Sequence, residues 1–133
     1  MATLNMPPSQ TTWQKITVPY SVIQTASLTN TVALLTLPAL WIVHNVFMNV
    51  TTAFAGTTTL VLSVGKSSAT TKWVSSLSVL SLGLLPGNAI NAPIPESNSS
   101  STVINLYATS TLSNLSNLTQ GSVDIYLLVS QLS

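Results

Sequence analysis

The stretch from Leu34 to Gly65, LLTLPALWIVHNVFMNVTTAFAGTTTLVLSVG, decides the fold that the sequence predicts. It contains no charged residue, and it is rich in the β-branched and aromatic residues that favour strands. Leu40 to Val50 has apolar side chains at both odd and even positions, which predicts a strand covered on both faces. Thr58 to Val64 alternates more cleanly, with Leu60, Leu62 and Val64 directed inward and Val61 on the opposite face. Thr51 to Thr58 supplies the turn, and we expect the two strands to be the central pair of an all-β sandwich.

Segments on both sides of this pair also have the alternation of strands. Lys15 to Tyr20 contains Pro19, which cannot donate to a ladder, so we expect an edge strand there. Ser122 to Gln131 places four aliphatic side chains on the core face, and Asp124 and Tyr126 on the opposite face. The other candidate strands are Val32–Leu37, Trp73–Leu85, with a break between Val79 and Leu80, and Thr102–Ser110, and the predicted loops are Gly65–Lys72 and Pro86–Ser101. Seven or eight strands with almost no helix fit a two-sheet sandwich or a jelly roll.

The length of 133 residues corresponds to one domain. We expect an extended N-terminal arm over residues 1–14 and a single β-sandwich domain over residues 15–133. The arm carries four notable residues: Met6, Pro7, Pro8 and Trp13. Two interpretations of it stay open, a frayed terminus or an arm that lies on a neighbouring subunit with Trp13 as its anchor.

The sequence is almost uncharged. Only 4% of its residues are charged, with three basic and two acidic side chains, whereas a typical soluble domain has about a quarter. Ser, Thr and Asn provide little charge repulsion between copies, so we expect the protein to work as part of an assembly. Three scattered lysines cannot displace the counterions of a nucleic acid, which argues against nucleic-acid binding. There is no cysteine for a disulfide or a thiolate metal site.

A membrane span is the main alternative for the uncharged region Ile16 to Gly65. The most apolar window, Val32 to Val50, contains Pro38 and several polar residues, and it lacks basic residues at its ends. These features disfavour a spanning helix, so we expect no membrane association. The N-terminal residues also lack the basic start and the apolar core of a signal peptide.

The inventory of reactive side chains predicts no catalytic residue, metal site or cofactor. The single His, His44, lies within an apolar strand, and no G-x-S-x-G motif occurs. One Asp and one Glu are too few for a metal site, and a glycine-rich phosphate loop is missing. Asp124 is interpreted either as a solvated edge charge or as part of an intersubunit ion pair. We expect Trp13, Trp41 and Trp73 to serve in core and interface packing rather than in a sugar-binding platform.

Four motifs occur in a fixed order along the chain. They are TVPY at Thr17–Tyr20, TLPA at Thr36–Ala39 with IVHNV at Ile42–Val46, Phe54 with SVG at Ser63–Gly65, and GSVDIYLLVS at Gly121–Ser130. Together they resemble a group of small structural proteins of tailed bacteriophages, over most of residues 16–131. The low charge and the Ser-rich segment Ser75–Leu85 depart from the usual pattern of that group.

The resemblance implies a jelly-roll-like antiparallel β-sandwich of about eight strands and a role as a capsid decoration (cement) protein. It also implies synthesis in the host cytoplasm, binding to the major capsid protein on the head surface, and stabilisation of the capsid as a homotrimer. We expect the interface to include Met6, Pro7, Pro8, Trp13, Trp73 and Tyr126. The alternative is a tail-fibre or receptor- or carbohydrate-binding module of the virion, with the loop Pro86–Ser101 as its variable tip.

Overall fold

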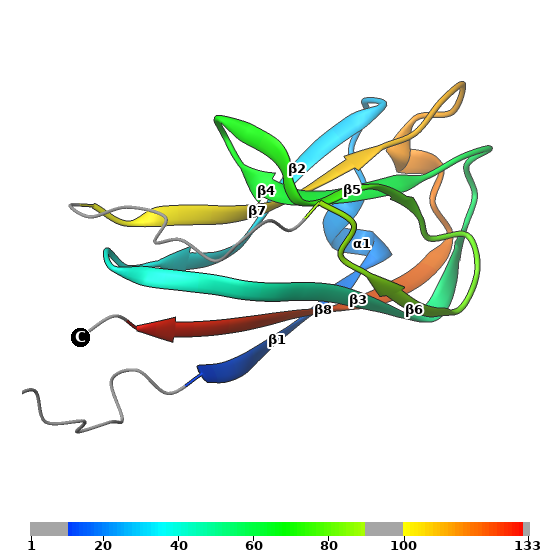
Figure 1. Cartoon of the computed structure of the whole chain (residues 1–133). Coiled ribbons are helices and arrows are strands. Elements are labelled where there is room, and N and C mark those ends of the chain that lie inside the picture. The colour runs from blue at the N-terminus through cyan, green and yellow to red at the C-terminus, as the bar shows by residue number, and fades with distance from the viewer. Residues whose placement is uncertain (1–10, 90–99, 132–133) are drawn as a thin grey trace, which may run out of the picture.

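The computed structural model describes residues 11–89 and 100–131. These residues form eight strands and two short helices, and the strands make two four-stranded sheets that face each other (Figure 1). The predicted all-β sandwich is therefore confirmed. In chain order the elements are β1 Thr11–Pro19, α1 Tyr20–Ile23, β2 Thr29–Leu37, β3 Trp41–Ala55, β4 Val61–Lys66, β5 Ala69–Ser78, β6 Gly83–Pro86, β7 Thr102–Thr109, the 3₁₀ helix η1 Leu115–Asn117 and β8 Gln120–Gln131.

The strand order is that of a jelly roll. One sheet, which we call sheet A, has the order β1-β8-β3-β6, and the other, sheet B, has the order β2-β7-β4-β5. The pairs β1–β8, β2–β7, β3–β6 and β4–β5 are all antiparallel. This is the pattern of one long hairpin rolled up around a core. As a result, the chain crosses between the sheets at every connection except the β4–β5 hairpin.

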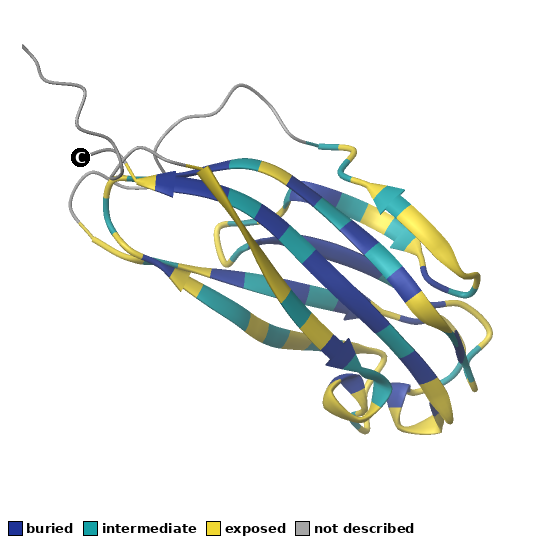
Figure 2. Ribbon diagram, turned by 90° about the horizontal axis from the view of Figure 1, so that it is seen from below, coloured by how far each residue is buried: buried dark blue, intermediate teal, exposed yellow. Residues whose placement is uncertain are grey.

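The core lies between the sheets and is built by alternate residues of the strands. The inward residues predicted for the last strand are confirmed as buried: Val123, Ile125, Leu127 and Val129. The same holds for the inward residues at and just before β4: Leu60, Leu62 and Val64. Figure 2 shows burial alternating along the strands of sheet A, with exposed residues mostly on the edge strands β1 and β6. On the inner strands β3 and β8, the side chains that point away from the core are therefore mostly half-buried rather than exposed.

Two predictions about the stretch from Leu34 to Gly65 are wrong. β3 and β4 are both inner strands, but they belong to different sheets and do not pair with each other. β3 also continues to Ala55, through much of the predicted turn. The reason is that alternation within a strand does not specify its partner, and consecutive strands of a jelly roll mostly cross to the opposite sheet.

A bulge in β3 changes which of its side chains face the core. The pairing register with β8 shifts between Val43 and Asn45, so that His44 is the extra residue. Val43 is buried before the bulge, and Val46 and Met48 are buried after it. A strand without a bulge would place Ile42, His44, Val46 and Met48 on one face, as expected from the sequence, and that expectation is wrong. Because of the bulge, the odd-numbered residues of the second half of β3 point outward.

The strand boundaries differ from the prediction in two further places. β1 begins at Thr11, so that Thr11–Gln14, assigned to the arm, pair with β8 instead. The predicted edge position of this strand is confirmed. Gly65–Lys72, predicted as a loop, forms the turn and the adjoining strand ends of the tight β4–β5 hairpin. The predicted break after Val79 is confirmed, because β5 and β6 lie in different sheets.

The two helices are short connections. α1 places Ile23 in the core, and η1 places Leu115 there. Over residues 11–89 and 100–131, no helix has both the length and the apolar character that crossing a membrane would require.

Candidate interaction surface

An aromatic row crosses the outer face of sheet A. It consists of Trp13 on β1, Tyr126 on β8 and Phe47 on β3. The register places Tyr126 between Lys15 of β1 and Phe47 of β3. Ring centroids are 4.7 Å apart for Phe47 and Tyr126, and 5.2 Å apart for Trp13 and Phe47. Three strands that are distant in the sequence therefore build one continuous apolar surface.

The orientation of the rings limits what this aromatic row can bind. The planes of Phe47 and Tyr126 are 13° apart, so the rings are stacked. Their centroid distance is close to the spacing of neighbouring strands, so the two rings stand side by side across the strands and direct their edges outward. Trp13 meets Phe47 at 73°, in an edge-to-face contact. A sugar platform needs ring faces that lie open to solvent, whereas these edges suit packing against protein side chains.

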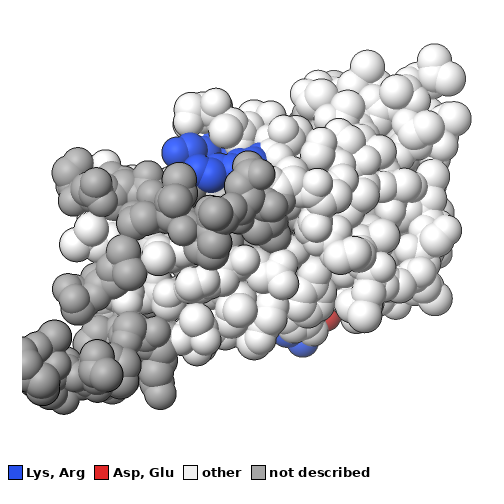
Figure 3. Space-filling view, viewed as in Figure 1, with Lys and Arg blue, Asp and Glu red and all other residues white. Residues whose placement is uncertain are grey.

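The charges on this face neutralise each other. Asp124 accepts a hydrogen bond of 2.7 Å from the Thr17 hydroxyl, and its carboxylate lies 3.7 Å from the ammonium of Lys15. Asp124 is only 7% exposed and lies on an inner strand. The interpretation of Asp124 as a solvated edge charge is therefore wrong, and within this chain its ion pair is with Lys15. Figure 3 shows one blue area on the side of sheet B and a smaller blue and red area on the side of sheet A, while the other described atoms in view are uncharged.

A shallow groove extends the apolar surface from the aromatic row to the edge of sheet A. Asn45 and Phe47 of β3 line it together with Leu84 and Pro86 of β6, and its volume is about 310 Å³. The register pairs Phe47 with Pro86, so the groove begins where the aromatic row ends. Leu84 is 66% exposed. The groove is wide enough to accept an apolar side chain of another protein.

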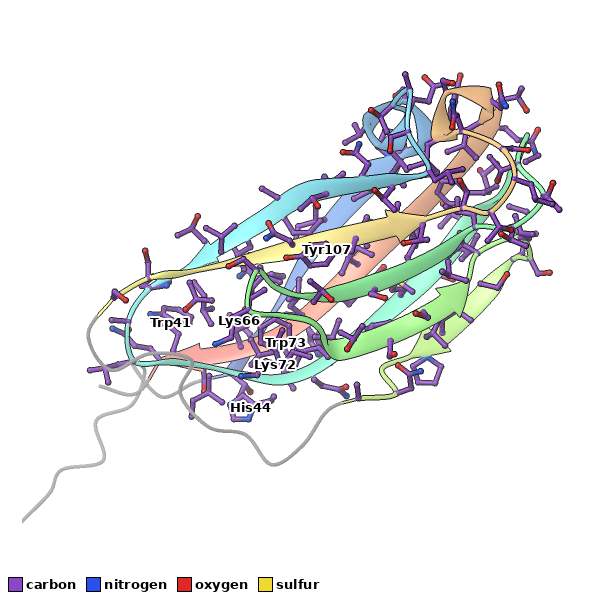
Figure 4. The ribbon with its side chains drawn as sticks, turned by 90° about the horizontal axis from the view of Figure 1, so that it is seen from above. Trp41, His44, Lys66, Lys72, Trp73 and Tyr107 are labelled. Atoms are coloured by element: carbon purple, nitrogen blue, oxygen red, sulfur yellow. The ribbon has the colours of Figure 1, made fainter. Side chains whose placement is uncertain are left out.

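The predicted interface residue Trp73 has a different role. It is 3% exposed and belongs to the core, so its assignment to an interface is wrong. The ammonium of Lys72 lies 5.6 Å from the centre of its indole ring (Figure 4). Trp73 follows directly on polar residues, which made it resemble a loop end. In the structure it is an inward residue of β5.

The structure brings two of the predicted interface residues together, Trp13 and Tyr126. Met6, Pro7 and Pro8 lie outside the described residues. The sequence interpretation missed Phe47 and Leu84. A signal for Phe47 existed, because it lies on the opposite face of its strand from the buried Met48 and Val50. For Leu84 no local signal existed, because its exposure follows from the edge position of the short strand β6.

The single histidine makes one specific contact. Its Nε2 lies 2.6 Å from the hydroxyl oxygen of Ser130, across β3 and β8 at the bulge. Asp124, the one acidic side chain within the described ranges, bonds to Thr17 and Lys15 rather than to His44. No cluster of three potential metal-binding side chains occurs among residues 11–89 and 100–131. The observed contact of His44 is therefore one that joins two strands.

No protein-family model and no curated protein sequence matches this chain. Solved structures do. The chain is similar to one from the capsid asymmetric unit of cyanophage Pam1, with a TM-score of 0.72 and 16% identity over 98% of this chain and 94% of that chain. It is similar to one from the capsid of Ralstonia phage GP4, with a TM-score of 0.59 and 12% identity over 100% of this chain and 92% of that chain.

A third similar chain comes from the acid-stable capsid of the Helicobacter pylori bacteriophage KHP30. Its TM-score is 0.54, with 18% identity over 96% of both chains. In all three comparisons nearly the whole of each chain is aligned, so the similar proteins are about as long as this one. At these identities the likeness concerns the fold: the chain has a jelly-roll architecture that also occurs in phage capsids.

Proposed function

We propose that this protein is a non-enzymatic structural component of a bacteriophage virion, which binds the outer surface of the capsid and stabilises it as a homotrimer. The observation that carries the proposal is the whole-length likeness to three chains of phage capsids, each of about the same length. A likeness over one part of a large shell protein would not support the role of a small, separate capsid component.

The surface chemistry supports the same role. With 4% charged residues, the protein has little electrostatic repulsion to keep its copies apart. The outer face of sheet A carries an aromatic row and an apolar groove, and its two charged residues form an ion pair with each other. Burying such a face costs little desolvation free energy, because it carries no unpaired charge. The major capsid protein is the expected partner on the shell.

Two observations guide the choice between a capsid component and a receptor-binding module. The stacked rings of the aromatic row direct their edges outward, which disfavours a sugar platform. Trp73 is buried in the core, so it is not available to extend such a platform. The predicted variable tip, Pro86–Ser101, lies mostly outside the described residues. We therefore favour the capsid role over a tail-fibre module.

Reconstitution tests the proposal. Particles assembled without this protein are mixed with the purified chain, pelleted, and heated until they release their genome. A chain that binds the intact shell better than the opened shell stabilises the intact particle by mass action. The chain should therefore co-sediment with the particles and raise the release temperature by at least a few degrees. A β-sandwich of similar size from an unrelated source controls for trapping in the pellet. A chain that stays in the supernatant contradicts the proposal.

A further inference from the structure

We infer that the outer face of sheet A is the surface on which a second copy of this chain packs; the inference rests on the proposed function, because it names the self-contact of the proposed homotrimer. The face is defined by the aromatic row of Trp13, Phe47 and Tyr126 together with Leu84 and Pro86. Three properties of these residues select the face and its occupant.

The first property is the concentration of exposed apolar side chains. Trp13 is 46% exposed and Leu84 is 66% exposed, and the aromatic row and the groove connect them. Leu82, which is 67% exposed, lies directly before β6 at the edge of sheet A. The other exposed large apolar side chains lie on different elements or connections: Val22 on α1, Leu28 and Leu40 before β2 and β3, Val103 on sheet B, and Leu112 after β7. A continuous apolar surface marks an interaction site, whereas single exposed residues are ordinary.

The second property is preorganisation. The ring of Phe47 contacts both the Tyr126 ring and the Trp13 ring, so the three rings lose little conformational freedom when a partner arrives. Their outward edges, beside a groove that accepts a side chain, are suited to interdigitation with another protein surface. A flat glycan ring would find no open aromatic face between Phe47 and Tyr126.

The third property is charge, and it selects the occupant. Lys15 and Asp124 pair with each other, so the face is neutral as a unit. Its complement must also be nearly free of charge, because a charge buried against apolar rings without a partner is costly. An ordinary protein surface is rich in charged residues. A second copy of this chain, with 4% charged residues overall, has the required composition.

A pair of matched variants tests this inference. Leu84→Asp adds one negative charge to the face, at a side chain that contributes little to the core. Leu112→Asp makes the same change at a position that is 89% exposed and lies on the β7–β8 connection, away from the face. Its φ of 68° is a conformation that Asp tolerates better than Leu, so this control should fold. Circular dichroism and thermal melts establish that both variants are folded, and sedimentation velocity over a range of concentrations gives the dissociation constant.

We expect the wild type and Leu112→Asp to associate with the same constant, and Leu84→Asp to associate at least about tenfold more weakly. Trp13→Ser, from the other end of the aromatic row, should weaken association as well. A folded Leu84→Asp and a folded Trp13→Ser that both associate like the wild type would overturn the inference. A wild type that stays monomeric at every concentration would also overturn it.

The outcomes separate this inference from the proposed function. If the chain associates through the face but does not bind particles in the reconstitution experiment, the proposed function fails and the self-contact stands. If folded Leu84→Asp and Trp13→Ser chains bind particles less well while their self-association is unchanged, the face belongs to the shell rather than to a second copy, and the inference is wrong.

Discussion

The phenyl ring of Phe47 lies against the phenol ring of Tyr126, with their centroids 4.7 Å apart and their planes 13° apart. The two residues come from β3 and β8, the two inner strands of sheet A, and they are direct cross-strand partners. This contact holds the two rings of the aromatic row together on the outer face of sheet A, outside the core. Its energy and its role in association can be measured separately.

A double-mutant cycle gives the energy of this contact. We expect Phe47→Ala and Tyr126→Ala each to destabilise the chain, and the two together to cost less than the sum of the single losses. The coupling should be about 0.5–1.5 kcal/mol, the usual value for a stacked pair. Urea unfolding of the four proteins provides the measurement. Strictly additive losses of stability would mean that the two rings have no interaction energy with each other.

Gly121 should tolerate no side chain. Its φ is +139°, and a Cβ there would lie 2.3 Å from the ring of Phe54, which is buried. Gly83 provides a matched control, because its φ is +131° but nothing lies within 4 Å of its Cβ position. Gly83→Ala should cost about 1–3 kcal/mol for the backbone conformation alone. Gly121→Ala should cost roughly 1–3 kcal/mol more, from overpacking against Phe54. Equal losses, measured by denaturant unfolding, would show that the ring moves aside freely.

The tryptophans should differ strongly in what they contribute to stability. Trp73 is buried in the core, so Trp73→Ala should destabilise the chain by about 3–5 kcal/mol. Trp13 is half-exposed on an edge strand, and Trp13→Ala should cost no more than about 1.5 kcal/mol, chiefly from its contact with Phe47. Thermal and urea unfolding compare the two. A larger loss for Trp13 than for Trp73 would contradict the assignment of one to the outer face and the other to the core.

Stability should depend little on salt. Asp124, the one acidic side chain among the described residues, forms an ion pair with Lys15, and the side chain of Lys15 is mostly exposed. The substitution Lys15→Met should therefore cost less than about 1 kcal/mol of stability. Asp124 keeps its hydrogen bond from Thr17 in that variant. For the wild type, the free energy of unfolding in urea should change by less than about 1 kcal/mol when salt shortens the screening length from about 10 Å to about 3 Å. A loss of several kcal/mol would reveal a much larger electrostatic contribution to the fold.

The sequence predicted the strands of this fold better than their partners. Val123, Ile125, Leu127 and Val129 on β8 keep a strict period of two, because an inner strand with one buried face leaves no other choice. The bulge at His44 breaks that period in β3, and no residue type near His44 in the sequence indicates a bulge. Pairing in a jelly roll joins the first strand to the last, so the distance along the chain between partners removes any local signal.

The candidate interaction surface was harder to predict for the same reason. Trp13, Phe47 and Tyr126 come from three segments, and only the register between β1, β8 and β3 brings their rings together. Trp13 resembled the anchor of an arm because prolines precede it, and Trp73 resembled an exposed loop end because polar residues precede it. The low charge of the chain was the part of the surface chemistry that the composition indicated correctly.

The location and symmetry of this chain in the particle test the proposed capsid role most directly. Electron cryo-microscopy of intact particles, with the chain identified by its own density, provides that measurement. We predict many symmetry-related copies on the outer surface of the shell, grouped in trimers. Purified particles that lack the chain, or that carry it only at the tail, would contradict the proposal.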